Sequence, residues 1–329
     1  MKRTIDINSL SVEAVLKLFD SLVLPVLTYG IEVWFWNTEI AAILSGKASL
    51  SIKMLSRDSL EKIHMQVIKW TLNVHKRSSN IGCYGETGRQ PIGVKCLPQI
   101  LRYFSNLERL SGGVDEHNAA DVPLAILAFL DQRDLQLKWH SIIKSICNRH
   151  TTASAAHSES IKKSCCNEFI QFWKYEKSTQ NKLRFYHNAK SEFCYEEYLS
   201  TLPQNIRCHV TRLRISAHTL KIEKGRYNIK CGNARLLEKV CDFCTEKRIA
   251  DTMLHELPFF EPIIEDELHV LVACPKYNIP RSMIPPEVLS TLLRLDIFEV
   301  FNHKEYIYHL GRYIKRIFEV RDYKPLKNK

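Results

Sequence analysis

The sequence contains little glycine or proline and no long uninterrupted hydrophobic run. Eleven glycines and twelve prolines in 329 residues exclude a collagen-like chain and a broadly disordered one. The most apolar stretch, residues 22–36, is interrupted by Pro25, Gly30 and Glu32 and is too short to span a bilayer. Polar residues follow the basic N-terminus without a small-residue cleavage site, which argues against a secretory signal. We therefore expect a soluble protein with no membrane partner.

The cysteines show no disulfide-framework spacing. Eight of the eleven are scattered along the chain: Cys83, Cys96, Cys147, Cys165, Cys166, Cys194, Cys208 and Cys231. In a chain of this length, reduced intracellular thiols are the better interpretation, and we expect a nuclear or cytoplasmic location. The sequence also has no internal repeat, no heptad run and no phosphate-binding loop with a Walker lysine.

Positive charge predominates over negative charge. The 47 Lys and Arg residues against 36 Asp and Glu residues give a net charge of +11. With 45% hydrophobic residues, the chain is long enough for a substantial core and for two or more structural units. The positive balance favours a polyanionic partner, most simply the backbone of RNA or DNA.

The spacing of apolar residues predicts a mainly helical protein. Helices are expected over residues 12–23, 59–72, 94–110, 123–147 and 304–321. The helix from Ser59 is expected to bury Leu60, Ile63, Val67, Trp70 and Thr71. We expect the apolar segment 24–36 in the core, tight turns over 78–93 and a linker over 151–160.

Two titratable residues, one in the apolar segment 24–36 (helix or strand) and one in the helix from Ser59, have both structural and functional interpretations. Glu32 lies in the apolar segment, where a buried, paired acid is more common than a catalytic carboxylate. His64 lies on a predicted helix, where a packed or half-exposed structural histidine is more common than a ligand. The sequence alone leaves both alternatives open.

The most specific pattern is a metal-ligand spacing near the C-terminus. Cys241 and Cys244 form C-x2-C, and His269 and Cys274 form H-x4-C after a spacer over residues 245–268. Two thiolates in a tight turn, and a His and a Cys from one helical turn, predict one structural zinc ion held by three cysteines and one histidine. The alternatives are core cysteines with a packed histidine, or His255 of the acidic, proline-containing spacer as a competing ligand.

A strongly basic segment precedes this motif. Residues 205–239 contain nine cations against Glu223 and Glu238; the nine are Arg207, Arg212, Arg214, Lys221, Lys224, Arg226, Lys230, Arg235 and Lys239. Helical spacing puts four residues of the segment on one face: Arg207, Arg214, His218 and Lys221. This face is predicted to contact a phosphate backbone, with a merely solvated surface as the alternative.

The last helix carries a second set of cations. Its spacing places Leu310, Ile314 and Ile317 inward and Arg312, Lys315 and Arg316 outward. We expect the outward residues to contribute to the same nucleic-acid surface.

Several segments together resemble the C-terminal region of reverse transcriptases from non-LTR (LINE-type) retrotransposons. KLFDSLVLPVLTYGIEVW and KIHMQVIKWTLNVHKRSSNIGCYGETGRQP resemble the region after the polymerase palm. RLRISAHTLKIEKGRY, CDFC and EDELHVLVACPKY resemble the zinc-knuckle segment, and YIYHLGRYIKRIFEVR resembles the final helix. The resemblance implies the same four zinc ligands. It also implies a recognition segment on Arg214, His218, Arg226 and Tyr227.

On this basis the chain divides into five consecutive parts. Residues 1–112 are the post-palm helical region and 113–160 a variable helix and linker. Residues 161–235 form an aromatic and basic helical region, 236–280 the zinc module and 281–329 the C-terminal basic helix.

The resemblance implies nucleic-acid binding without polymerase activity. A reverse-transcriptase palm holds its two metal ions on an aromatic-x-Asp-Asp turn and a further Asp, and no such turn occurs here. We therefore expect the palm upstream of Met1 and no enzymatic activity in this chain. The alternatives are a subunit that assembles in trans with a palm-bearing polymerase chain, or a degenerate element remnant without function.

Overall fold

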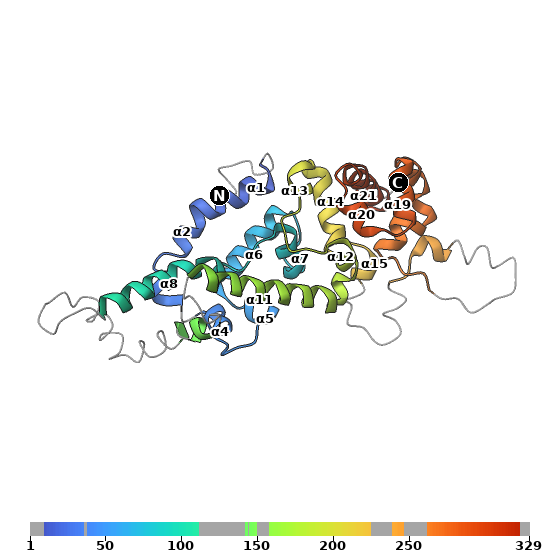
Figure 1. Ribbon diagram of the computed structural model, residues 1–329. Coiled ribbons are helices and arrows are strands. Elements are labelled where there is room, and N and C mark those ends of the chain that lie inside the picture. Colours follow the sequence, from blue (N-terminus) through green and yellow to red (C-terminus); the bar gives the residue numbers. More distant parts are fainter. Residues whose placement is uncertain are drawn as a thin grey trace, which may run out of the picture. The chain divides into compact units, whose positions relative to one another are not determined.

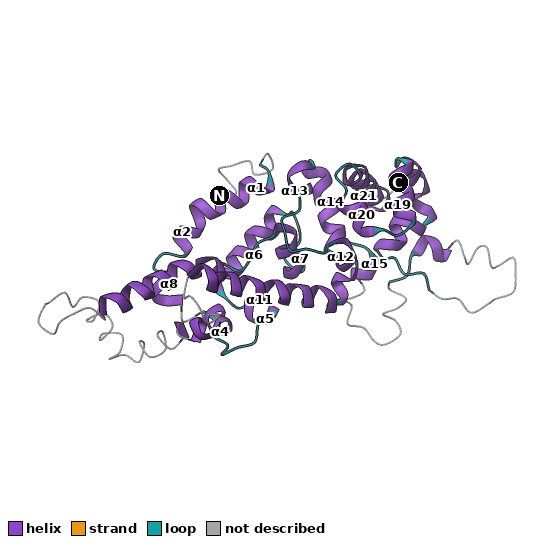
Figure 2. Cartoon of the chain, viewed as in Figure 1, coloured by secondary structure: helices purple, strands orange, loops and turns teal. Residues whose placement is uncertain are grey.

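The computed structural model describes residues 10–35, 38–111, 142–143, 145–149, 158–224, 239–246 and 262–322. Helices make up most of these segments, and the expected mainly helical fold is confirmed (Figure 2). Within these ranges no strand is formed, and Val240 and Ile264 form an isolated antiparallel bridge. None of the described helices is both long enough and apolar enough to cross a membrane.

The chain forms two compact units, and each combines segments that are distant in the sequence. One unit contains residues 1–13, 69–86 and 177–329, and we call it the C-terminal unit. The other contains residues 14–68 and 87–176, and we call it the N-terminal unit. The sequence had instead divided the chain into five consecutive parts.

The N-terminal unit is built from short helices and three longer ones (Figure 1). Its elements are most of α1 (Val12–Leu18), the π-helix η2 (Phe19–Val23), α2 (Leu24–Leu27), α3 (Ile31–Trp34), α4 (Glu39–Leu44), α5 (Ile52–Leu55), most of α6 (Ser59–Thr71), α8 (Ile92–Ser111) and most of α11 (Ser158–Thr179). Ile40 of α4 packs against Gly93 of α8, where an added Cβ would lie 2.5 Å from Ile40 Cγ2. Glycine therefore permits the close approach of these two helices.

Part of the apolar segment expected in the core is exposed. Ile31 and Phe35 are buried, but Val26 and Tyr29 are 75% and 87% exposed, and Leu22, just before the segment, is 58% exposed. Glu32 is half-buried and accepts a hydrogen bond from Gln99 Nε2 at 2.7 Å. A short helix can bury only one side, and here the opposite side is also apolar.

The helix α6 buries a polar pair that the apolar pattern did not indicate. His64 is buried and its Nδ1 lies 2.7 Å from Glu61 Oε1, while Arg89 Nε donates to His64 Nε2 at 2.9 Å. Ile63, expected to face inward, is exposed. The packed, structural interpretation of His64 is confirmed, and the buried face is rotated towards Glu61 and His64.

The glycine-containing stretch after α6 is a helix, so the prediction of tight turns was wrong. The helix α7 (Asn80–Thr87) includes Gly82, and Gly88 follows it with a positive φ of 60°. A Cβ on Gly82 would lie 2.9 Å from Ile215. The glycine is therefore a packing site within a helix, and only Gly88 has the backbone conformation that favours glycine.

The C-terminal unit contains the remaining helices (Figure 1). They are α7 (Asn80–Thr87, all but its last residue), η4 (Asn181–Leu183), α12 (Arg184–Ala189), α13 (Tyr198–Thr201), α14 (Gln204–Arg214), α15 (Lys221–Lys224), η5 (His269–Ala273), η6 (Pro275–Tyr277), α18 (Asn278–Ser282), α19 (Pro286–Leu293), α20 (Ile297–Asn302) and α21 (Tyr306–Asp322). The last helix packs against α14, α18, α19 and α20. Its inward residues Leu310, Ile314 and Ile317 are buried, as the sequence predicted.

Several predictions lie outside the described residues. They are most of the helix over 123–147, most of the linker over 151–160, most of the acidic spacer with His255, and the basic residues 226–235.

Candidate metal centre

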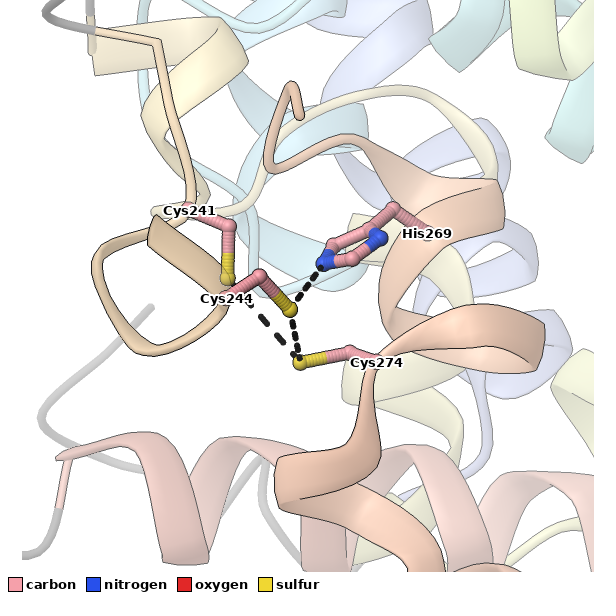
Figure 3. Close-up of side chains that lie close together, drawn as sticks. All are labelled: Cys241, Cys244, His269 and Cys274. Atoms are coloured by element: carbon pink, nitrogen blue, oxygen red, sulfur yellow. Dashed lines mark hydrogen bonds between the residues drawn. The ribbon is translucent and has the colours of Figure 1, made fainter. Parts of the chain in front are cut away.

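Four side chains of the C-terminal unit converge on one point (Figure 3). They are Cys241, Cys244, His269 and Cys274, the four residues that the sequence pattern predicts. One ligand atom from each lies within 4.8 Å of all the others, so the group can hold one metal ion. The structure therefore brings together two half-motifs that the spacer separates in the sequence.

The distances between the donor atoms match the edges of a tetrahedron. The Sγ atoms of Cys241 and Cys274 are 3.9 Å apart, and those of Cys244 and Cys274 are 3.7 Å apart. Cys244 Sγ lies 3.5 Å from His269 Nε2. A four-coordinate ion with metal–sulfur bonds of about 2.3 Å and metal–nitrogen bonds of about 2.0–2.1 Å would separate two sulfurs by about 3.8 Å and sulfur from nitrogen by about 3.6 Å. The donor set fits a closed tetrahedral site.

A π-helical turn brings His269 and Cys274 to the same side. In an α-helix, residues five apart point about 140° away from each other around the axis. The turn η5 is instead a π-helix, and the Cys274 N–H donates to the His269 carbonyl at 2.7 Å, an i+5 hydrogen bond. The wider turn reduces the angular offset between the two ligands. Such π-turns are frequent at functional sites.

Backbone pairing holds the other two ligands beside this turn. The Cys241 N–H donates to the Ile263 carbonyl at 2.8 Å, and the Glu265 N–H donates to the Lys239 carbonyl at 2.8 Å. These hydrogen bonds flank the Val240–Ile264 bridge. Asp266 Oδ1 accepts the His269 N–H at 2.8 Å, so Asp266 fixes the start of the turn. The bridge thus joins the two half-motifs independently of the rest of the spacer.

The three thiols are buried and His269 is half-buried. The hydrogen bond with Cys274 lowers the pKa of the Cys241 thiol well below its ordinary value. The same hydrogen bond, together with burial, raises the pKa of Cys274. A thiolate at Cys241 is the form that ligates a metal ion.

Several contacts tie the centre to the last helix. Tyr313 of α21 donates its hydroxyl to the Leu271 carbonyl at 2.8 Å. Arg321, near the end of α21, makes two hydrogen bonds to the Glu265 carboxylate, at 2.9 and 3.0 Å. Arg281 of α18 donates to the carbonyls of Leu271 and Cys274, both at 3.1 Å. The metal-binding segment and α21 are therefore parts of one hydrogen-bonded structure.

These supporting residues were missed by sequence reasoning. Glu265 and Glu267, on either side of Asp266, bind residues from distant parts of the sequence. Glu267 accepts from Ser216 Oγ at 2.8 Å and lies 2.9 Å from His218 Nε2, and it also pairs with Arg184. No local pattern could reveal these partners because each lies about 50 residues or more away in the sequence.

Two predicted nucleic-acid contacts are buried instead. Arg214 is fully buried and His218 nearly so, and both pair with carboxylates. Their expected place on a single helical face was wrong because α14 ends at Arg214. The N–H groups of Ser216 and Ala217 donate to the carbonyls of Leu213 and Arg212, at 3.2 and 2.7 Å, and Ser216 has a φ of 51°. This Schellman motif stops the helix before His218.

Two further arginines of the basic segment are half-buried and bound to backbone carbonyls. Arg212 donates to the Asn73 carbonyl at 3.0 and 2.8 Å, and Arg207 donates to the Leu10 carbonyl at 3.4 Å. Lys221 pairs with Asp242. Each of these three cations therefore has a partner within the protein.

The remaining predicted contacts divide into exposed residues and residues outside the described segments. Lys224, Arg312 and Arg316 are exposed and Lys315 is half-buried. Arg226 and Tyr227 lie outside the described residues. Among the described cations of the prediction, the exposed side chains therefore lie chiefly on the outward face of α21.

Comparison with known proteins gives no identification. No family model matches the chain, and no curated protein and no solved structure is significantly similar to it.

Proposed function

We propose that this chain is a nucleic-acid-binding module in which one structural zinc ion supports a basic helical surface. We further propose that it represents the C-terminal, zinc-knuckle part of a non-LTR retrotransposon reverse transcriptase. The observation that carries the proposal is the connection between the four-donor centre and the cationic helix α21. The net charge of +11 and the resemblance of the sequence segments support it.

The donor set favours zinc in a structural role. Three thiolates and one imidazole are soft and borderline ligands that suit zinc better than magnesium or calcium. Four protein ligands complete a tetrahedral shell and leave no open position for a water molecule or substrate. The centre therefore belongs with structural sites, whose metal contributes folding free energy.

In this proposal the metal-bound segment acts by positioning α21. Glu265 and Leu271 flank His269 in the sequence, and they bind Arg321 and Tyr313 of α21. Because the metal fixes this segment, the segment holds α21 in place. The outward face of α21, opposite to these contacts, is then directed towards a polyanion. Arg312, Lys315 and Arg316 of that face would contact phosphates of RNA or DNA.

The proposal assigns no polymerase activity to the chain itself. Nucleotidyl transfer requires carboxylates that hold two metal ions, and the aromatic-x-Asp-Asp turn is absent from the sequence. Within the metal-binding segment, Glu265 is paired with Arg321, and Glu267 with Arg184 and His218.

Salt-dependent binding tests the proposal. Fluorescence anisotropy would measure the affinity of the zinc-loaded chain for labelled RNA and DNA between 50 and 200 mM salt. Phosphate contacts predict an affinity that falls steeply with salt, with a slope that grows with the number of neutralised phosphates. Absence of binding at low salt, or binding that is unchanged at high salt, contradicts the proposal.

A second candidate function is a subunit that assembles in trans with a palm-bearing polymerase chain. It is favoured by the exposed apolar side chains of Leu22, Val26 and Tyr29, in a segment that resembles the region after the palm. Contiguous exposed apolar residues are typical of protein interfaces. Co-purification with a palm-bearing chain that is lost in Val26→Glu would support it, and primer extension by the isolated chain would contradict both candidates.

A further inference from the structure

A groove of about 660 Å³ lies on the C-terminal unit beside the outward face of α21. Its walls come from the start of α14, from α18 with the two residues that follow it, Met283 and Ile284, and from α21. The lining includes Ile206, Pro280, Met283, Tyr308 and Arg312. None of the four metal donors lines it, so the groove is separate from the candidate metal centre.

Apolar side chains line part of the groove, some of them buried and some exposed. Ile206, Pro280 and Ile284 are buried and form part of the lining. Met283 and Tyr308 line the same groove but are 74% and 42% exposed. The exposed ring of Tyr308 offers a stacking surface for a planar group, and the flexible thioether of Met283 adds an apolar surface to the same groove.

The groove is also positively charged. Arg312, Lys315 and Arg316 line it against a single carboxylate, Glu319. Glu319 pairs with Arg316 at 2.9 Å and with Lys315 at 3.8 Å. Arg312 has no ion pair among the described residues, and its guanidinium carbon lies 6.0 Å from the centroid of the Tyr308 ring. An exposed arginine beside an aromatic face can hold a phosphate next to a stacked base.

We propose that this groove binds single-stranded nucleic acid, with an unpaired base on Tyr308 and the neighbouring phosphates on Arg312 and Arg316. This inference rests on the proposed function and narrows it to one strand conformation and one site. Aromatic stacking surfaces combined with cations are typical of single-strand binding sites. The volume lies within the range of about 300–1,000 Å³ found for small-molecule sites, so it suits a base and its sugar.

Other polyanions fit the groove less well. A duplex keeps its bases stacked inside and presents phosphates, so it would leave Tyr308 and Met283 without a partner. An acidic peptide would satisfy the cations but has no planar base for the tyrosine. The apolar surface of Tyr308 and Met283 therefore distinguishes the single strand from both.

Anisotropy titrations of the zinc-loaded full chain test this inference. The probes are a labelled ten-nucleotide oligo(dT), a labelled hairpin duplex of equal charge and a labelled polyglutamate peptide. Tyr308→Ala is expected to weaken oligo(dT) binding by about 5- to 100-fold and to leave hairpin binding within about twofold. Tyr308→Phe, which keeps the ring, is expected to restore the wild-type affinity.

Matched controls separate stacking from general charge. Tyr175→Ala removes a tyrosine that is 65% exposed on α11 of the other unit and should leave oligo(dT) binding unchanged. Arg312→Gln should lower the salt slope for oligo(dT) by about 0.7, the value for one phosphate contact on a single strand. Arg57→Gln, at an exposed arginine outside the groove, should not change that slope. Thermal unfolding of each variant confirms that the fold is kept.

The outcomes distinguish this inference from the proposed function. If hairpin and oligo(dT) bind equally and Tyr308→Ala changes neither, the single-strand site is wrong while nucleic-acid binding stands. If polyglutamate binds as tightly as oligo(dT), the groove recognises charge alone and the inference is also wrong. If no nucleic acid binds at 50 mM salt, both proposals fail.

Discussion

Arg214 Nε donates to Glu86 Oε1 at 3.0 Å, and neither side chain has any exposed surface. The ion pair joins α14 to α7, the helix that the glycine-containing stretch forms. A second carboxylate, Glu196, lies 3.1 Å from Arg214 Nη2, and the Tyr198 ring centroid lies 5.3 Å from the guanidinium carbon. Arg214, which the sequence pattern assigned to a nucleic-acid surface, therefore holds two helices of the C-terminal unit together.

Removing the buried cation should strongly destabilise this unit. We expect Arg214→Leu to lower the free energy of unfolding by about 3–5 kcal/mol, because Glu86 loses its buried partner. Glu86→Gln should cost less, because Glu196 still faces Arg214. Urea denaturation measures both values. A loss below about 1 kcal/mol for Arg214→Leu would show that the pair contributes little.

Removal of the metal should unfold the segment around the candidate centre. Cys241→Ser is expected to reduce bound zinc from one ion per chain to a small fraction, measured by elemental analysis. Binding free energies of about 10–16 kcal/mol at structural zinc sites are comparable to the whole stability of a domain. Loss of the ion should therefore also loosen α21, seen as faster amide hydrogen exchange.

Cys194→Ser is the control for this substitution. Cys194 is an exposed thiol outside the donor group, so its replacement should leave both the zinc content and the exchange rates unchanged. Zinc at full occupancy in Cys241→Ser would show that the other donors suffice or that another ligand replaces the thiolate.

The contact between α14 and α21 depends on Gly311. An added Cβ would lie 2.6 Å from Ile206 Cγ2 and 3.1 Å from Val210 Cγ2. Overpacking of this kind typically costs about 1–3 kcal/mol, and the helix propensity of alanine offsets about 1 kcal/mol. We expect Gly311→Ala to lower the free energy of unfolding by up to about 2 kcal/mol. In an Ile206→Ala background the same substitution should be neutral or stabilising, and a double-mutant cycle by urea denaturation checks this.

The N-terminal unit should show acid sensitivity through Asp20. Its carboxylate accepts from Arg89 Nη1 at 3.1 Å and pairs with Lys95 at 2.8 Å. Burial alone raises the pKa of Asp20, but the hydrogen bonds and charges of these two cations outweigh it and lower the pKa. A lowered folded-state pKa contributes stability above the unfolded pKa of about 3.9 and loses it as the pH falls through the folded value.

Thermal melts between pH 6 and pH 3 measure this contribution. Asp20→Asn should lower Tm by about 2 °C at pH 6, and the difference from the wild type should shrink below about pH 4. Glu159→Gln is the control. This carboxylate is 71% exposed, and its ion pair with Lys162 is long, at 3.7 Å. A difference for Asp20→Asn that grows on acidification would contradict the assigned direction of the pKa.

The sequence by itself determined the helical character, the inward face of α21 and the four metal ligands. Each depends on neighbours within one or two helical turns, or on a ligand spacing that allows few other uses. Leu310, Ile314 and Ile317 follow the helical period, and the two half-motifs each supply two donors from one turn.

Only the tertiary structure decided which cations are exposed and where α14 ends. Helical spacing treats Arg214 and Arg312 alike, because each is a cation on an amphipathic helix. Glu86, distant in the sequence, pairs with one of them, whereas a groove adjoins the other. Burial of a charge depends on a partner brought close by folding, and local periodicity carries no information about that partner.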